Sequence, residues 1–171
     1  MNKGMTKTRK LGIMAMFVAA GLVLQYIESR FAAANVPGGK LGLANMVSII
    51  NIFMFGGGNA LLIASLRAVL GCVLMGGISA LPYSFFGAFF SAAAMWGAKK
   101  WLYPKISMIG ISVIGASVHN ISQLFVASAI FSSWYVFSYL PGLLLFAVLS
   151  GTVTGYATEV FARRAFKEVV K

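Results

Sequence analysis

The side chains of this sequence that could do chemistry are few, and the most unusual of them is Arg67. It stands in the middle of a long apolar segment that contains no other charge. An arginine inside a membrane-spanning helix costs at least about 2.5–3.5 kcal/mol, so it must face a polar partner, a wet cavity or a ligand. The sequence has no Asp, and its three Glu are not expected near the centre of a helix, so an internal ion pair is hard to build. Backbone carbonyls and polar side chains, or an anionic ligand, would therefore have to satisfy Arg67.

A second polar group lies in another apolar segment, where His119 and Asn120 are adjacent and Gln123 follows one helical turn after His119. One interpretation is structural, because a single histidine inside a helix bundle can simply hydrogen-bond to its neighbours. The other interpretation is a pocket shared with Arg67, which is expected at a similar depth. A metal site is not expected, since one His without Cys or Asp supplies too few ligands.

Two further residues could extend this pocket. Asn45 either bonds to neighbouring helices or continues the pocket towards Lys40 in the preceding loop. The candidate substrate-binding residues are therefore Lys40, Asn45, Arg67, His119, Asn120 and Gln123. No catalytic residue and no cofactor is expected, because the chain has three carboxylates, one His, one Cys and no G-x-x-x-x-G-K-[ST] phosphate loop. The lone Cys72, among apolar neighbours, is expected to serve helix packing.

The composition determines which kind of element positions these residues. Hydrophobic residues make up 60% of the 171 and charged residues only 10%, whereas a soluble domain has about a quarter of its residues charged. A water-soluble globule is therefore excluded. A nucleic-acid partner is excluded as well, despite the net charge of +11, because the Lys and Arg residues stand in short groups between long apolar runs. An all-α integral membrane protein remains, with the lipid bilayer as its surroundings.

Six apolar segments are expected to form transmembrane helices in a single domain spanning residues 1–171. A helix needs about 20 apolar residues to cross the hydrocarbon core of a bilayer. With that length as a guide, the predicted helices cover residues of about 11–27, 43–55, 59–76, 80–98, 107–130 and 137–161. The second is the shortest, and the triple glycine that follows it predicts a tight turn.

The positive charges predict how these helices are oriented. Eleven of the 14 Lys and Arg residues fall in the N-terminal tail, the loop between the fourth and fifth helices, and the C-terminal tail. Six helices place all three of these regions on the same side of the membrane. Since Lys and Arg accumulate in cytoplasmic loops, both termini are expected in the cytoplasm of a multi-pass cell-membrane protein.

Small residues at a spacing of four occur in several helices and allow close helix contacts. Ala15 and Ala19 lie on one face of the first helix, and Gly151 and Gly155 do the same in the sixth. Such patterns are common by chance in helices rich in Ala and Gly. For any single pattern, packing inside the protein is therefore expected more often than a partner interface.

The loop before the sixth helix, residues 131–139, is rich in aromatic side chains. One interpretation is the interfacial belt, in which Trp and Tyr rings settle among lipid headgroups. The other is a lid or stacking wall over a pocket that opens outward.

Three segments give the chain a resemblance to a known family. They are Pro37-Gly38-Gly39-Lys40-Leu41-Gly42-Leu43-Ala44-Asn45, Leu66-Arg67 with Leu70-Gly71, and Ser117-Val118-His119-Asn120-Ile121-Ser122-Gln123-Leu124. On these residues the chain resembles the Gx transporter family, often labelled heptaprenyl diphosphate synthase component I. More broadly, it is similar to the substrate-binding S components of energy-coupling factor (ECF) transporters.

The resemblance implies a specific role. An S component has six helices, a pocket in the outward half, and an alanine patch on the first helix that docks a transmembrane coupling subunit. Ala15 and Ala19 match that patch. The chain would then capture a small vitamin-like, quinone-precursor or isoprenoid-type substrate, and ATPase subunits in other chains would drive its import. Replacing Arg67 by alanine should weaken ligand binding and leave folding largely intact.

The synthase label agrees poorly with the residues. Prenyl diphosphate synthases of the usual kind hold magnesium and diphosphate with aspartate-rich motifs, and this chain has no aspartate. The chain is therefore not expected to be an enzyme. The alternative to a transport role is an accessory membrane subunit of a quinone, isoprenoid or electron-transfer pathway, without catalysis of its own.

Overall fold

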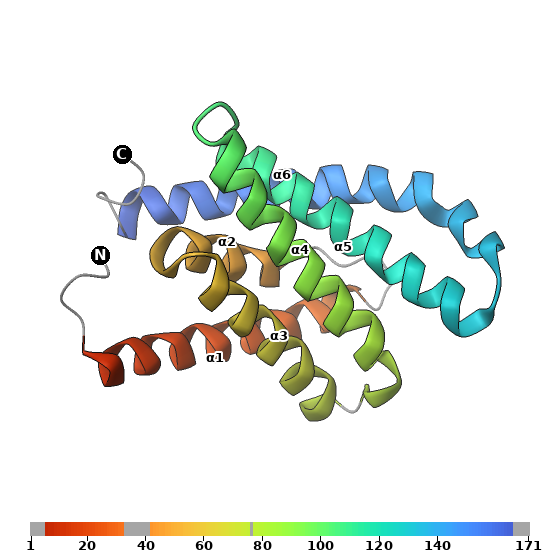
Figure 1. Cartoon of the computed structure of the whole chain (residues 1–171), viewed down its shortest axis with the longest axis horizontal. Coiled ribbons are helices and arrows are strands. Elements are labelled where there is room, and N and C mark those ends of the chain that lie inside the picture. The colour runs from red at the N-terminus through yellow and green to blue at the C-terminus, as the bar shows by residue number, and fades with distance from the viewer. Residues whose placement is uncertain (1–5, 33–41, 76, 166–171) are drawn as a thin grey trace.

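The computed structural model describes residues 6–32, 42–75 and 77–165, and within them the chain forms six α-helices and two short 3-10 helices (Figure 1). The α-helices are α1 (Lys7–Ala32), α2 (Leu43–Phe55), α3 (Gly57–Leu74), α4 (Leu81–Leu102), α5 (Met108–Phe131) and α6 (Leu140–Ala165). The 3-10 helices are η1 (Ile78–Ala80) before α4 and η2 (Trp134–Tyr139) before α6. The prediction of an all-α fold with six helices is confirmed.

Five of the helices are long and apolar enough to cross a membrane, and α2 is the exception. At a rise of about 1.5 Å per residue, the 13 residues of α2 extend only about 20 Å. A bilayer core is about 30 Å thick, so α2 cannot cross it alone. Gly42 precedes α2 and Gly56 follows it, and both have positive φ angles of 75° and 80° that glycine adopts without strain.

The first helix extends beyond the predicted end near residue 27. Glu28 lies inside α1, which continues to Ala32, although a carboxylate near the end of an apolar run usually indicates the membrane surface. The helix can continue because the carboxylate of Glu28 is buried and accepts a hydrogen bond from the backbone N–H of Gly42. Similarly, residues 137–139 belong to η2 and not to the sixth helix.

The helices α3, α4, α5 and α6 pack successively against one another, and α1 packs against α2 and α3. The short helix α2 contacts five others, so it lies in the centre of one half of the bundle. Its Ile49 and Ile52 are fully buried in a core with Met95 of α4 and Ile111 of α5. The polar residues discussed below lie beyond the N-terminal end of this apolar core.

Lys99, near the end of α4, fixes the C-terminal end of α2. Its Nζ donates a hydrogen bond to the carbonyl of Ile52 at 2.9 Å and lies 4.4 Å from the centre of the Phe53 ring. The last carbonyls of a helix have no partner within the helix and attract cations. The predicted end of the fourth helix at residue 98 was too early, because α4 continues to Leu102.

Helices α5 and α6 approach each other most closely at two glycines of α6. A β-carbon on Gly151 would lie 2.7 Å from Val113 Cα, and one on Gly155 would lie 2.6 Å from Ile109 Cα. Both distances are shorter than any side chain tolerates, so only glycine allows these backbones to touch. The interpretation of this glycine pair as internal packing is confirmed.

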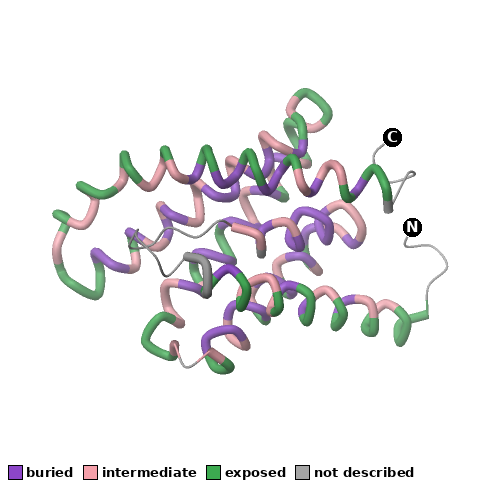
Figure 2. The backbone as a smooth tube through the Cα atoms, turned by 180° about the vertical axis from the view of Figure 1, so that it is seen from behind, coloured by how far each residue is buried: buried purple, intermediate pink, exposed green. Residues whose placement is uncertain are grey.

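The exposed surface along the sides of the bundle is strongly apolar. Large hydrophobic side chains of α6 are widely exposed, including Leu145 at 70%, Leu149 at 68% and Val153 at 61%. Figure 2 shows exposed positions along much of α1 and α6. A soluble monomer rarely exposes a contiguous apolar patch of this kind, whereas lipid tails would cover it at no cost. The surface therefore fits a bilayer environment.

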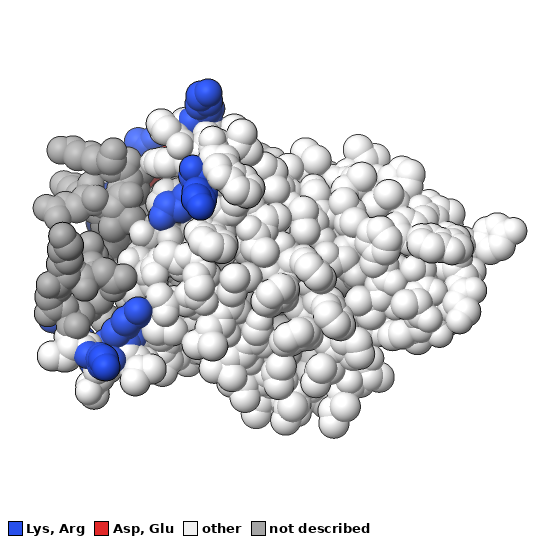
Figure 3. Space-filling model, viewed as in Figure 1, with Lys and Arg blue, Asp and Glu red and all other residues white. Residues whose placement is uncertain are grey.

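Apart from Arg67, the described basic side chains gather at one end of the molecule, where α1 begins and α6 ends (Figures 1 and 3). They come from the start of α1, the connection between α4 and α5, and the end of α6. This end is called the charged end below. The folded chain thus brings together three groups of charges that are far apart in the sequence.

Candidate functional site

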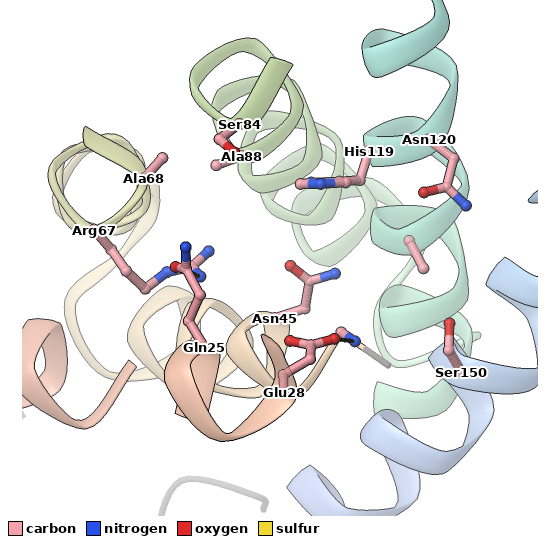
Figure 4. Close-up of a pocket in the computed structure, with 12 residues that line it drawn as sticks. Gln25, Glu28, Asn45, Arg67, Ala68, Ser84, Ala88, His119, Asn120 and Ser150 are labelled. Carbon is pink, nitrogen blue, oxygen red and sulfur yellow. Dashed lines mark hydrogen bonds between the residues drawn. The ribbon is translucent and has the colours of Figure 1, made fainter. Parts of the chain in front are cut away.

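A small polar cavity lies between all six α-helices and is shown in Figure 4. Its volume is about 50 Å³. The residues that line it are Gln25, Glu28, Gly42, Asn45, Arg67, Ala68, Ser84, Ala88, Ala116, His119, Asn120 and Ser150. The structure therefore brings Asn45, Arg67, His119 and Asn120 together, as the sequence predicted.

Arg67 crosses from α3 to α1 at the edge of this cavity. Its side chain is 5% exposed, and Nη1 donates a hydrogen bond to Gln25 Oε1 at 3.2 Å. Among the described residues, no partner satisfies its Nε. A guanidinium whose donors are only partly used, inside an apolar bundle, remains able to bind a further acceptor.

Two glycines make room for this polar contact. A β-carbon on Gly21 of α1 would lie 2.6 Å from Arg67 Cδ, and one on Gly71 of α3 would lie 2.4 Å from Gln25 Nε2. On each of these two helices, a glycine thus leaves room for the polar side chain of the other helix. Each helix supplies a polar residue and, four positions away, the glycine that accommodates its partner's.

Glu28 is the residue that the sequence analysis did not anticipate. Its carboxylate is 3% exposed, lines the same cavity as Arg67, and accepts the hydrogen bond from Gly42 N–H at the start of α2. As expected, Glu28 does not lie near the centre of its helix, but α1 is longer than predicted and its C-terminal part, with this carboxylate, is buried. In the sequence, Gln25 and Glu28 are three residues apart and share a helix face with Gly21, but this spacing does not show that the carboxylate is buried.

His119 and Asn120 point in different directions (Figure 4). The ring of His119 lies against α4, where a β-carbon on Gly87 would be 2.9 Å from its Cε1. Asn120 donates its Nδ2 hydrogen to the carbonyl of Leu143 on α6 at 2.9 Å. His119 therefore faces the region of Arg67, while one end of the Asn120 amide connects α5 to α6.

The other predicted residues take different places. Asn45 is buried at the first turn of α2, and its backbone N–H bonds to the carbonyl of Gly42. Gln123 is half-buried one turn farther along α5 and is not among the described residues that line the cavity. Lys40 lies outside the described residues.

The chemistry of the cavity is that of recognition by hydrogen bonds and charge. Arg67, Asn45 and Gln25 can donate hydrogen bonds, Glu28 can accept them, and one cation is matched by one anion. In the part of the chain that the structure describes, no three His, Cys or Glu side chains gather as a metal site requires. With a volume of about 50 Å³, the cavity has room for only a few water molecules.

The aromatic loop is separate from this cavity. Trp134 and Phe137 stack with ring centres 5.4 Å apart, and Phe137 meets Phe125 of α5 edge-on at 5.1 Å. Trp134 and Tyr135 remain 73% and 89% exposed, and no described residue of the loop lines the cavity. This placement favours the interfacial belt over the lid.

Ala15 and Ala19 lie on the exposed side of α1. On an adjacent face of the same helix, Met14 and Val18 are buried against Ile63 of α3. The alanine pair is therefore not used for packing within the chain, unlike the glycine pair of α6.

An apolar bundle with five long spanning helices and a buried charged cavity defines a multi-pass membrane protein. A family model described as heptaprenyl diphosphate synthase component I matches residues 17–161. The chain therefore belongs to the heptaprenyl diphosphate synthase component I family, as its motifs suggested. No curated protein and no solved structure matches the chain.

Proposed function

We propose that the chain is a substrate-binding S component of an ECF-type ATP-driven importer. The observation that carries this proposal is the charged cavity, to which all six helices contribute in an otherwise apolar bundle. Burying both charges is expensive and is not needed to hold apolar helices together. A site for a small vitamin-like, quinone-precursor or isoprenoid-type substrate gives these charges a purpose. Asn45, Arg67 and His119 would contact the substrate, with Asn120, Gln123 and Lys40 around them.

The proposed orientation follows from the charged end. If the charged end lies in the cytoplasm, both termini would be cytoplasmic, and the cavity would lie towards the outer side of the membrane. Since the chain has no phosphate-binding loop, ATPase subunits in other chains would supply the energy. We propose no catalysis by this chain, because it lacks the aspartates that would hold magnesium and diphosphate.

Native mass spectrometry of the protein purified from its own host tests the binding role. The wild-type chain is expected to retain a small molecule, and His119→Ala is expected to lose it while keeping its helix content. The matched control is Thr152→Ala, which changes an exposed polar residue of α6 that bonds only to its own helix. Absence of any retained molecule, together with no thermal stabilisation by a panel of candidate substrates, would contradict the proposal.

The exposed alanine pair is the proposed docking site for the coupling subunit. Ala15→Trp with Ala19→Trp is expected to abolish co-purification of the other subunits, because two indole rings prevent close helix approach. Ligand retention should be unchanged, since both residues face away from the cavity. Leu145→Trp with Leu149→Trp, on the exposed side of α6, is the matched control. Co-purification that survives the alanine replacements would place the docking surface elsewhere.

The second candidate function is an accessory membrane subunit of a quinone, isoprenoid or electron-transfer pathway. The small volume of the central cavity favours it, because sites for drug-sized ligands usually measure about 300–1,000 Å³. The family description "component I" also implies partner subunits. In this case the native spectrum would contain a protein partner but no small molecule.

A further inference from the structure

A second cavity adjoins the first at the end of the bundle opposite the charged end. Its volume is about 150 Å³, and it lies between the C-terminal ends of α1 and α3 and the N-terminal end of α4. It is called the vestibule below. The residues that line it are Gln25, Glu28, Ser29, Gly71, Cys72, Met75, Gly77, Ala80 and Ser84. Its volume is three times that of the central cavity.

The vestibule and the central cavity share three lining residues. Gln25, Glu28 and Ser84 line both of them, so these side chains form part of the partition between the two spaces. Gln25 is held in this partition by Arg67 and occupies the gap above Gly71. A rotation of the Gln25 side chain, which costs one hydrogen bond, would bring the two spaces together.

The charges are distributed unequally between the two cavities. Glu28 lines both, whereas Arg67 lines only the central one. Among the described residues that line the vestibule, Glu28 is the only charged one. A molecule in the vestibule therefore meets a carboxylate first and the guanidinium only after passing the partition.

We propose that the vestibule is the entrance to the central cavity and that Glu28 selects what passes through it. The ligand presents an N–H or cationic group to Glu28 and a carbonyl or carboxylate group to Arg67. It is a zwitterion or a neutral ring with both donors and acceptors, and not a simple anion such as a diphosphate. This inference deepens the proposed function, on which the statement about the ligand rests.

Cys72 provides a reporter inside the vestibule. It is the only cysteine of the chain, and its side chain is 5% exposed and lines this space. In the purified full-length protein in detergent, its rate of modification is measured with two methanethiosulfonates. One carries a cationic trimethylammonioethyl group and the other an anionic sulfonatoethyl group of similar size. Both rates are divided by those of free cysteine in the same buffer.

After this division, the modification rate with the cationic reagent is expected to be about ten times the rate with the anionic one. The reason is that a carboxylate in a partly dehydrated space attracts cations strongly. In Glu28→Gln this difference should disappear. Any effect of Glu28 on the reactivity of the thiol itself cancels in the ratio. If Glu28→Gln does not fold, the pair Glu28→Gln with Arg67→Met removes both charges together and should show the same loss. Glu159→Gln, at the charged end, should keep the wild-type ratio.

Three results would overturn the inference. Cys72 could resist both reagents in the folded protein while reacting fully after denaturation, which would show that the vestibule is not accessible from outside. The ratio could equal that of free cysteine in the wild type, which would remove the selection. Millimolar inorganic diphosphate could protect Cys72, which would show that simple anions occupy the site. None of these measurements requires a partner subunit or a known substrate, so a failure of the proposed docking or transport role would leave them unaffected.

Discussion

Replacing Arg67 by alanine is expected to lower the free energy of unfolding by about 3–5 kcal/mol, because it leaves a buried carboxylate without a compensating charge in the same cavity. The substitution leaves the carboxylate of Glu28, which is 3% exposed, without its nearby cation. It also empties the space above Gly21 and removes the partner of Gln25. Titration with sodium dodecyl sulfate, followed by circular dichroism, measures the loss.

The double variant Arg67→Met with Glu28→Gln separates the charge from the packing. Both replacements keep nearly the same side-chain length, and together they leave no unpaired charge in the bundle. The double variant is expected to be more stable than Arg67→Ala and close to the wild type, because neutral side chains can often replace two buried opposite charges without loss. The single variants Arg67→Met and Glu28→Gln are measured as well. If the double variant lost more stability than the two single variants lost together, Arg67 and Glu28 would not stabilise each other.

Ligand retention should respond differently from stability. The double variant is expected to fold and yet lose the small molecule in the native spectrum, since both the donor and the acceptor of the site are gone. This contrast distinguishes a binding role for Arg67 from a purely structural one. It also changes the expectation from the sequence alone, by which alanine at this position leaves folding largely intact.

The candidate site could be predicted from the sequence where placing a residue inside an apolar segment has a very high free-energy cost. Arg67 was recognisable because an arginine within an apolar segment must be satisfied, and His119 because it interrupts another such segment. Glu28 could not be recognised in the same way. It stands near the end of its apolar run, where a carboxylate normally meets water, and only the fold shows α1 continuing to Ala32 and Gly42 approaching it.

The helices were predictable for a similar reason. Five of the six have the apolar length of a membrane span, and α2 is recognisable as a shorter apolar run before the triple glycine. The three groups of basic residues predict a common side of the membrane, and their described members lie at one end of the molecule. Lateral contacts do not follow from length. Alanine and glycine pairs at a spacing of four look alike in the sequence, yet Ala15 and Ala19 are exposed while Gly151 and Gly155 are buried against α5. Which face of a helix meets a neighbour depends on the whole arrangement.

The buried glycine pair gives the other large expected effect. Gly155→Val is expected to destabilise the protein by about 3 kcal/mol or more, at the upper end of the range for overpacked cores. The reason is that the new β-carbon would meet the backbone of α5 at Ile109 and not a side chain that can rotate away. The α5–α6 pair would have to separate, and the hydrogen bond between Ser112 Oγ and Thr154 Oγ1, now 3.0 Å long, would be lost with it.

Gly142 supplies the matched control on the same helix. A β-carbon at this position would have no atom within 4 Å, so Gly142→Ala should leave stability unchanged or raise it slightly through better helix propensity. Both variants are compared with the wild type in the same detergent titration, and Gly151→Ala provides an intermediate case. Its β-carbon would lie 2.7 Å from Val113 Cα, so even one methyl group should be costly. If Gly151→Ala and Gly142→Ala were equally stable, α5 and α6 would not be in backbone contact at Gly151.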